Sequence, residues 1–143
     1  MSKLLKENLL QISHYEGIGY LPIIDYGEWR VAILRYHPNL EVSEINTMQR
    51  HDETDEVFVL LDGQCILFIG EGEEQPGAIH AVNMEPLKAY NVKEGAWHTH
   101  TLSQDATVLI VENRDTTNVN SPTIPLSNEQ CAFLMDQTKL LWT

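Results

Sequence analysis

From Tyr20 onward, short apolar runs alternate with turn residues every eight to twelve positions, and this spacing most constrains the fold. Runs of this length that are rich in Val, Ile, Leu, Phe and Tyr are typical of strands, and their regular spacing indicates an all-β sandwich or barrel. The expected strands cover residues 19–25, 28–36, 44–51, 55–61, 64–70, 78–84, 87–92, 96–101 and 107–113.

Two turns are expected to fold neighbouring strands into hairpins. Asp62-Gly63 separates two runs that are apolar on both faces, and Asp-Gly is a strong signal for a two-residue hairpin turn. We therefore expect strands 55–61 and 64–70 to be central, antiparallel neighbours. The stretch GEGEEQPGA, residues 70–78, is rich in Gly and Glu and is expected to form the exposed tip of another hairpin.

The two ends of the chain lie outside this β region. Residues 2–12 carry apolar side chains at near-helical spacing, which predicts a short amphipathic helix or an arm packed on the body. After a polar linker, Ser127 followed three residues later by Gln130 predicts a capping box and a C-terminal helix. We expect a single domain over residues 1–143, with a barrel at about 19–113 and the linker and helix at about 114–143.

The charge of the chain excludes two classes of partner. There are 21 acidic against 9 basic residues, which gives a formal net charge of −12. Such a field repels nucleic acid and anionic membranes, so neither is expected as a partner. Lys3, Lys6 and Glu7 interrupt the N-terminus before an apolar run reaches signal-peptide length, and no later segment approaches a membrane span. A soluble, cytoplasmic protein is expected.

Polar residues that can bind metals gather at the ends of these strands. Residues two apart in a strand face the same side, so Gln49 and His51 project together, and so do His98 and His100. Glu56 enters from the next strand after a turn. If these strands line one barrel mouth, two neutral imidazoles and a carboxylate leave open positions for water and substrate. Such a set suits Zn, Mn, Fe or Ni.

The spacing of these residues resembles that of the cupins, a family of small β-barrels with two short motifs. The first motif reads Gly, five residues, His-x-His, three or four residues, Glu, six residues, Gly. Glu56 and Gly63 match its second half, and His51 matches the second histidine. Gln49 stands where the first histidine belongs, and Ser43 stands where the first glycine belongs.

The second cupin motif reads Gly, five residues, Pro-x-Gly, two residues, His, three residues, Asn. KEGAWH matches it in part, because Gly95 and His98 have the expected spacing, while Lys93 and Leu102 replace the Pro and the Asn. The resemblance covers roughly residues 30–113. It implies an all-β, cupin-type double-stranded β-helix, or jelly-roll barrel, here with a short N-terminal arm and a C-terminal helix.

The resemblance to cupins also implies a metal site inside the barrel. Its ligands would be His51, Glu56 and His98, with Gln49 as a weaker oxygen donor in place of the missing imidazole. His100 can replace Gln49 as a third imidazole or can donate to a bound substrate. Because the first motif histidine is absent, a metal-free polar pocket is the alternative.

A narrower resemblance is to the ureidoglycolate lyase group of cupin-fold proteins. MQRH before an apolar strand, and GAWHTHTL before ATVLIVEN, match this group at Arg50, His51, Trp97 and His98. The resemblance implies a small hydroxy-acid or ureido substrate that is split by general-base chemistry. A metal or His98 would activate the hydroxyl, and a cationic group would hold the carboxylate.

Two functions are compatible with these residues, and a third reading is a structural dimer with a vestigial pocket that its own side chains plug. The first is a metal-dependent enzyme of the lyase, isomerase or oxygenase type that acts on a small polar molecule, with Glu56 as ligand and His98 or His100 as acid or base. The second is a metal-free cupin that binds or senses a small ligand without catalysis. Asp52, Glu53 and Asp55 are expected to form a solvated turn.

Some apolar residues predict contact with a second chain. Trp97 faces the opposite side of its strand from His98, so we expect it to point outward or into a subunit interface. The tail KLLWT is too apolar for solvent and is expected to pack on the barrel or on a second copy. A homodimer is the simplest assembly.

Overall fold

The computed structural model describes residues 5–143, which form strands, two short 3-10 helices and one α-helix. In chain order, the elements are β1 (Gly19–Tyr26), β2 (Trp29–Arg35), η1 (Pro38–Leu40), η2 (Val42–Glu44), β3 (Thr47–Gln49), β4 (Glu56–Asp62), β5 (Cys65–Gly70), β6 (Ile79–Asn83), β7 (Ala89–Val92), β8 (Trp97–Leu102), β9 (Thr107–Asn113), β10 (Thr123–Pro125) and α1 (Asn128–Leu141). Within the described part of the chain, no helix has the length and apolar character needed to cross a membrane.

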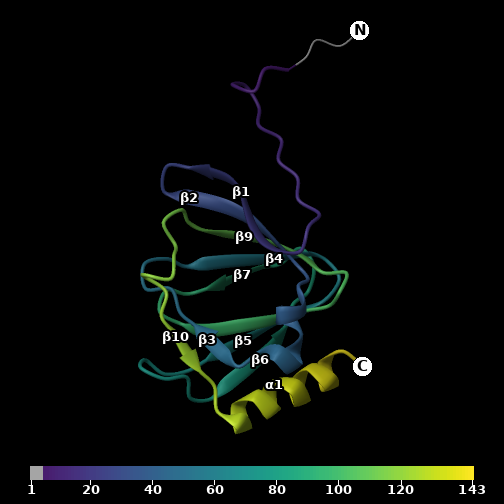
Figure 1. Ribbon diagram of the computed structural model, residues 1–143, viewed down its shortest axis with the longest axis vertical. Helices are drawn as coiled ribbons and strands as arrows, with labels where there is room; N and C mark the ends of the chain where they lie inside the picture. Colours follow the sequence, from purple (N-terminus) through teal and green to yellow (C-terminus); the bar gives the residue numbers. More distant parts are fainter. Residues whose placement is uncertain (1–4) are drawn as a thin grey trace.

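The strands form two five-stranded antiparallel sheets that face each other (Figure 1). The first sheet has the order β1-β2-β9-β4-β7, and the second has the order β10-β3-β8-β5-β6. The chain changes sheet at every connection except those between β1 and β2 and between β5 and β6, so it winds between the two layers. This is the jelly-roll arrangement, and the predicted all-β double-stranded β-helix is confirmed.

The turn at Asp62-Gly63 does not form the predicted hairpin. β4 pairs with β7 and β9, whereas β5 pairs with β6 and β8, so this turn carries the chain from one sheet to the other. Gly63 has a φ of 70°, and a Cβ there would lie 2.6 Å from backbone atoms of Ala106. Glycine is therefore required by a positive φ and a close approach. A strand that is apolar on both faces can be buried beside any other strand. The apolar pattern of these two strands therefore could not identify which strands they pair with.

The hairpin predicted around residues 70–78 is confirmed, because β5 and β6 pair as antiparallel neighbours on either side of it. The C-terminal helix also begins as predicted. The Ser127 side chain accepts a hydrogen bond from the backbone N–H of Gln130, and the Gln130 side chain accepts one from the backbone N–H of Ser127. This reciprocal pairing satisfies two of the donors that a helix start leaves unpaired.

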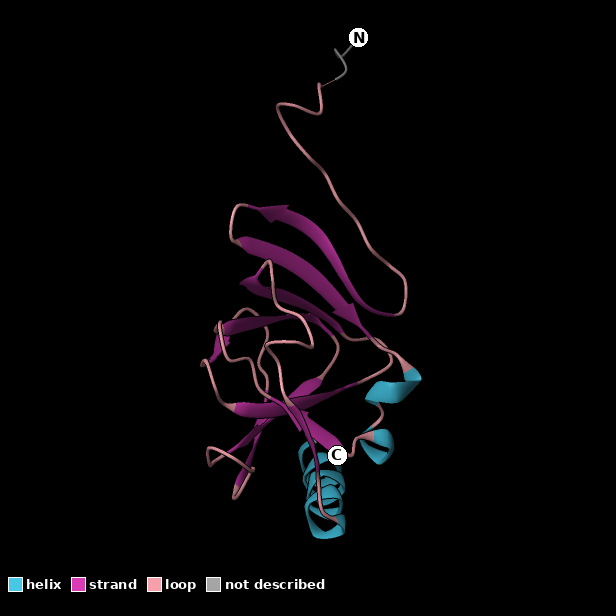
Figure 2. Ribbon diagram, turned by 60° about the vertical axis from the view of Figure 1, so that its left-hand side comes forward, coloured by secondary structure: helices cyan, strands magenta, loops and turns pink. Residues whose placement is uncertain are grey.

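The apolar core has two parts, one on each side of the second sheet. The space between the sheets is filled by residues that alternate along the strands, including Ala32, Phe58, Leu60, Leu67, Val108 and Ile110. The other part lies where α1 packs against the outer face of the second sheet (Figure 2), and it contains Ile45, Met48, Ile66, Phe68, Trp97 and Leu134. Both faces of the second sheet are therefore buried within one chain.

Trp97 and the C-terminal tail pack within this second part of the core. Trp97 faces away from His98 as predicted, but it is only 2% exposed, and its indole N–H donates to the carbonyl of Glu73. The indole N–H of Trp142 donates to the side chain of Asn83, so the tail packs on the barrel. The expected position of Trp97 in solvent or in an interface is wrong, because the chain's own C-terminal helix and the loop after β5 cover this face.

Residues 5–18 form no helix and extend away from the barrel (Figure 1). Leu9 and Ile12 are exposed by 71% and 83%. The predicted helix is therefore wrong over residues 5–12, and residues 2–4 of that prediction lie outside the described residues. A helix this short needs packing on the body for stability, and this segment makes little contact with the barrel.

Candidate metal centre

His51, Glu56 and His98 converge inside the barrel from three separate segments. His51 lies in the loop after β3, Glu56 begins β4, and His98 lies in β8. The Nε2 atoms of both histidines are 3.0 Å from Oε1 of Glu56. All three residues are buried, and their donor atoms lie within 4.8 Å of one another. The two sheets therefore bring together three potential metal ligands from opposite sides of the barrel.

Hydrogen bonds on the far side of each imidazole orient the two rings. Nδ1 of His98 lies 3.0 Å from the carbonyl oxygen of Ala96, which can only accept, so Nδ1 carries the proton. Nδ1 of His51 lies 2.7 Å from the hydroxyl of Ser121, and this hydroxyl donates to the side chain of Asn120. The hydroxyl oxygen thus accepts from His51. In its neutral form, each ring therefore directs an Nε2 lone pair at Glu56.

The donor set fits a divalent metal. Two nitrogen lone pairs and a carboxylate that face one another repel, because each is electron-rich. A positive charge between them removes this repulsion, and either protons or a metal ion can supply it. Two ligands at right angles around an ion, each about 2.1 Å from it, are separated by about 3 Å, which is the spacing found here. Two imidazoles and one carboxylate also leave coordination positions open. The buried group can therefore hold a metal ion.

Without a metal, the same contacts shift the protonation of these residues. Burial disfavours a charge on His51, but the hydrogen bond and the negative charge of Glu56 outweigh burial and raise the pKa of His51 above its ordinary value. Burial likewise opposes a charge on Glu56, yet His51 and His98 hold the pKa of Glu56 well below its usual range. Glu56 is therefore a carboxylate, which is the form that binds a metal.

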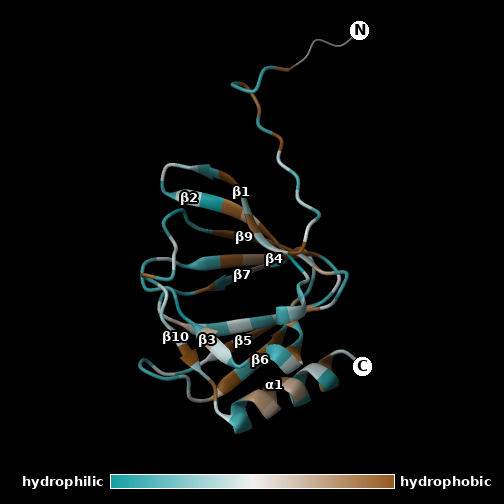
Figure 3. Cartoon of the chain, in the orientation of Figure 1, coloured by the Kyte–Doolittle hydropathy of each residue, from teal (hydrophilic) through white to brown (hydrophobic). Residues whose placement is uncertain are grey.

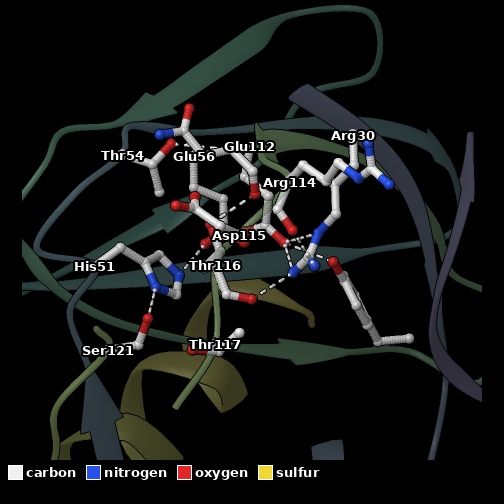
Figure 4. A network of polar contacts seen from close by, with 12 residues as sticks. Arg30, His51, Thr54, Glu56, Glu112, Arg114, Asp115, Thr116, Thr117 and Ser121 are labelled. Carbon is white, nitrogen blue, oxygen red and sulfur yellow. Dashed lines mark hydrogen bonds and ion pairs between the residues drawn. The ribbon is translucent and has the colours of Figure 1, made fainter. Parts of the chain in front are cut away.

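A second polar network borders Glu56 and was not predicted from the sequence. Glu112 and Arg30 are cross-strand partners on β9 and β2, and Glu112 lies beside Glu56 at the end of the β9–β4 ladder. One oxygen of Glu112, Oε1, accepts hydrogen bonds from the Tyr20 hydroxyl at 2.5 Å and from Nε and Nη2 of Arg30 at 3.1 and 2.8 Å. Figure 4 shows this network beside His51 and Ser121.

This network holds two carboxylates side by side. Burial and the neighbouring Glu56 raise the pKa of Glu112, while the hydrogen bonds from Tyr20 and Arg30 oppose that shift. Arg30 also donates to the carbonyls of Arg114 and Thr116 at 3.1 and 3.0 Å. The ion pair between Arg30 and Glu112 therefore anchors the loop that continues to Ser121, behind His51. The sequence contained only a weak indication of this ion pair, because Arg30 and Glu112 are simply two charged residues at inward positions of apolar strands.

A cavity of about 470 Å³ opens beside these residues. Its walls include Tyr20, Arg30, Leu34, Leu40, Gln49, His51, Glu56, His98, His100, Ile110, Glu112 and Ser121. The structure thus places the site residues expected from the sequence, Gln49, His51, Glu56, His98 and His100, around one cavity. Their chemical roles stay predictions.

His100 and Gln49 border the cavity without joining the donor group. Within residues 5–143, neither ring nitrogen of His100 has a hydrogen-bond partner, and its Nδ1 is completely buried. Burial lowers the pKa of His100 to about 4, so the ring is neutral near pH 7. Gln49 pairs with His98 across β3 and β8 and donates its side-chain N–H to the carbonyl of Ser121 at 3.3 Å.

The acidic turn before β4 has a structural part and a solvated part. Asp52 and Glu53 are exposed, as expected. Asp55 accepts hydrogen bonds from the backbone N–H of Glu94 at 2.7 Å and from the side chain of Asn91 at 3.0 Å. These bonds lower the pKa of Asp55. Asp55 therefore ties the turn before Glu56 to the loop before His98.

Comparison with known proteins gives structural likeness only. No family model and no curated protein matches the sequence. Similar solved structures include a PAC13 variant from Streptomyces with uridine, at 7% identity and a TM-score of 0.55, covering 81% of this chain and 86% of that chain. The iron(II) form of HppE matches at 13% identity and a TM-score of 0.50, covering 66% of this chain and 50% of that chain.

A cupin-2 domain protein from Shewanella frigidimarina also matches, at 14% identity and a TM-score of 0.49, over 76% of this chain and 88% of that chain. Likeness at such identities bears on the fold alone. The narrower resemblance to the ureidoglycolate lyase group stays a prediction. Two interleaved five-stranded sheets, with a His-Glu-His group between them, have the architecture that the two sequence motifs implied. The chain therefore has the cupin fold.

Proposed function

We propose that this protein is a metal-dependent enzyme, in which His51, Glu56 and His98 hold a divalent ion and the adjacent cavity holds a small polar substrate. One observation carries the proposal: two imidazole lone pairs converge on a single carboxylate oxygen in a buried site. A cluster of polar groups in a core costs stability compared with apolar packing, so a purely structural role gives no reason for it. Metal binding does.

The residues of the chain divide the chemistry between them. A bound divalent ion supplies Lewis-acid polarisation of a substrate oxygen. Ser121 and the carbonyl of Ala96 keep the two histidines in the tautomer that presents Nε2 to the site. His100 faces the cavity as a neutral imidazole, so it can donate or accept a hydrogen bond at the substrate and serves as the acid or base in our proposal.

The charges around the cavity favour a substrate recognised through hydroxyl or carbonyl groups. Arg30 is the only lysine or arginine among the described residues that line the cavity. Its Nε, Nη1 and Nη2 atoms already donate to Glu112 and to two backbone carbonyls. A substrate carboxylate would therefore have the metal, and not Arg30, as its partner. A hydroxylated or ureido compound suits the remaining walls better than a dianion.

A lyase-type reaction on a small polar molecule is compatible with this fold, because PAC13 is described as a nucleoside dehydratase. A second candidate function is a metal-free binding or sensor module. The observation that favours it is Gln49, which occupies the position of the first cupin-motif histidine. In that case, protons in place of a metal would join His51 and His98 to Glu56.

Metal titration separates the two candidates. Chelator-stripped protein is titrated calorimetrically with Zn²⁺, Mn²⁺, Fe²⁺ and Ni²⁺, beside the double variant His51→Ala/His98→Ala. We expect one equivalent of at least one ion in the wild type and none in the double variant. The matched control is His14→Ala/His80→Ala, because both of these histidines form exposed ion pairs and it should bind like the wild type. Absence of stoichiometric binding, or equal binding by both double variants, contradicts the enzyme proposal.

A further inference from the structure

A second, smaller cavity adjoins the one beside the candidate metal centre. It has a volume of about 190 Å³. Its walls are formed by six residues: Thr47, Gln49, His98, Thr99, His100 and Thr123. Three of them, Gln49, His98 and His100, also line the larger cavity. The second cavity therefore meets the metal centre at His98 and at the two polar residues that the donor group leaves unused.

The pairing of the strands explains the position of the second cavity. Gln49 of β3 pairs with His98 of β8, and Thr123 of β10 pairs with Gln49. Cross-strand partners project to the same side of a sheet, so these three side chains form one row on the inner side of the second sheet. Beyond this row, Thr47 and His100 project to the same side, but the register of β3 and β8 contains no further pair. The second cavity lies along this unpaired part of the two strands.

Polar groups beside the second cavity lack partners within the described part of the chain. Figure 3 shows hydrophilic positions among the hydrophobic ones of the second sheet. Gln49 donates a side-chain N–H to the carbonyl of Ser121, but its side-chain oxygen accepts no hydrogen bond from the described residues. Nδ1 of His100 is buried and also has no partner there. Buried polar groups are normally paired, so the chain leaves hydrogen-bonding capacity unused on this side of the metal centre.

The composition of the second cavity suits a neutral, hydroxylated group. Among the described residues that line it there is no Lys, Arg, Asp or Glu. A charged substituent would lose hydration there without gaining a partner of opposite charge. The hydroxyls of Thr47 and Thr123 and the amide of Gln49 can both donate and accept hydrogen bonds, as the hydroxyls of a ligand can. A volume of about 190 Å³ corresponds to roughly six groups the size of a water molecule.

We propose that the substrate carries a neutral, hydroxylated arm, which lies in the second cavity and is selected by Gln49. This inference rests on the proposed function, because the other end of the substrate would bind at the metal ion. The substrate class is then a polyol or a sugar-like compound with a metal-binding oxygen at one end. Gln49 is a specificity-determining residue in this arrangement, and it does not bind the metal. His100 lines both cavities and lies between the two parts of the substrate.

Two-dimensional NMR of the isotope-labelled full chain tests the second cavity, with the four-carbon polyol erythritol as the probe. Titration of the metal-free and the Zn²⁺-loaded protein should shift the backbone amides of Thr47 and Thr123 and the side-chain amide of Gln49, and these shifts should saturate. Butane-1,4-diol lacks the two inner hydroxyls and should bind at least about fivefold more weakly. Equal affinities for the two compounds, or no saturable shift with erythritol, overturn the proposal.

Two variants test which groups recognise the polyol. Gln49→Met keeps the length of the side chain without its amide, and Thr123→Val keeps the branched shape without the hydroxyl. Each should raise the dissociation constant of erythritol about fivefold or more. The Zn²⁺ affinity, measured by chelator competition, should fall by less than the roughly tenfold expected for a group that serves the metal. Thr107→Val is the matched control, because this strand threonine lines neither cavity, and it should bind erythritol like the wild type.

The outcomes separate this inference from the proposed enzyme function. A loss of Zn²⁺ affinity of about tenfold or more in Gln49→Met assigns Gln49 to the metal and overturns the inference. Equal losses of erythritol affinity in Thr123→Val and Thr107→Val also overturn it. Zn²⁺ binding without erythritol binding contradicts the inference and leaves the proposed function intact. Erythritol binding by a chain that binds no divalent ion supports the second cavity and contradicts the enzyme proposal.

Discussion

Nε2 of His98 lies 3.0 Å from Oε1 of Glu56, although 42 positions separate the two residues in the chain. The contact exists because β8 belongs to the second sheet and β4 to the first, and their inward side chains meet between the layers. The candidate metal site therefore depends on the packing of the two sheets. Substitutions within it should affect metal affinity more than folding.

Glu56→Gln keeps the shape of the side chain and removes its charge. Metal affinity should fall by more than about 100-fold, because a carboxylate ligand is replaced by a weak neutral donor. Competition with a chromogenic chelator measures the loss. Glu85→Gln, at an exposed ion pair with Lys88, serves as the control and should leave the affinity unchanged. Equal affinities in the two variants would remove Glu56 from the ligand set.

Ser121→Ala removes the partner of Nδ1 of His51. The ring then loses its preferred tautomer and orientation, and metal affinity should fall by about 10- to 100-fold. Ser121→Thr keeps the hydroxyl and should restore most of the affinity. Ser103→Ala, where an exposed serine hydroxyl bonds to Asp105, is the control. If Ser121→Thr binds metal as weakly as Ser121→Ala, the hydroxyl is not the cause.

Metal affinity should decrease as the pH falls. His51 must lose its proton to bind a metal, and its pKa is raised, so competition by protons begins above the ordinary histidine value of about 6.5. Calorimetric titrations at several values between about pH 8 and pH 5 measure this dependence. A constant affinity over that range would count against His51 and His98 as ligands.

Glu112→Ala should destabilise the metal-free protein by about 3 kcal/mol, because it leaves Arg30 without its partner in a site where the arginine side chain is only 16% exposed. Glu112→Gln should cost less, since its side-chain oxygen can still accept from Tyr20 and Arg30. Urea unfolding measures both. Asp25→Ala breaks an exposed ion pair with Arg114 and should change stability by less than about 1 kcal/mol. Similar losses in Asp25→Ala and Glu112→Ala would contradict the role of burial.

His100→Gln should make the metal-free protein less sensitive to acid. The pKa of His100 is about 4 in the folded chain and about 6.5 when unfolded. The unfolded chain therefore takes up the proton first as the pH falls below about 6.5, and this costs the wild type roughly 2 to 3 kcal/mol near pH 4.5. The difference between wild type and variant, measured by urea unfolding at neutral and acidic pH, isolates this contribution. A difference that does not change with pH would show that His100 is not desolvated.

The grouping of His51, Glu56 and His98 could be predicted from the sequence because each lies in a short local motif. His51 and Glu56 are close in the chain, and His98 follows Gly95 at a characteristic spacing. Alternation along β8 placed the His98 side chain on the inward face, whereas His51 lies in the loop after β3, which is shorter than the strand predicted over residues 44–51. The alternation of side chains along a strand also predicted the side of β8 on which Trp97 lies. It could not predict that α1 covers Trp97, because alternation does not reveal which element packs on that face.

Contacts between distant strands carried no local signal. Arg30, Glu112 and Tyr20 come from three strands, and their association depends on the order β1-β2-β9-β4, which no residue pattern reveals. The turn at Asp62-Gly63 has the composition of a hairpin turn, yet it joins two sheets. In both cases the pattern determined that a strand is buried, whereas the packing of the whole barrel determined its neighbours.

Anomalous X-ray scattering from crystals grown with Zn²⁺ or Mn²⁺ tests the central claim most directly. The account predicts a single strong peak about 2.0 to 2.3 Å from Nε2 of His51, Nε2 of His98 and the carboxylate of Glu56. The peak should disappear in crystals of His98→Ala. Diffraction above the metal edge with no peak at this position, or with a peak only at other residues, would contradict it.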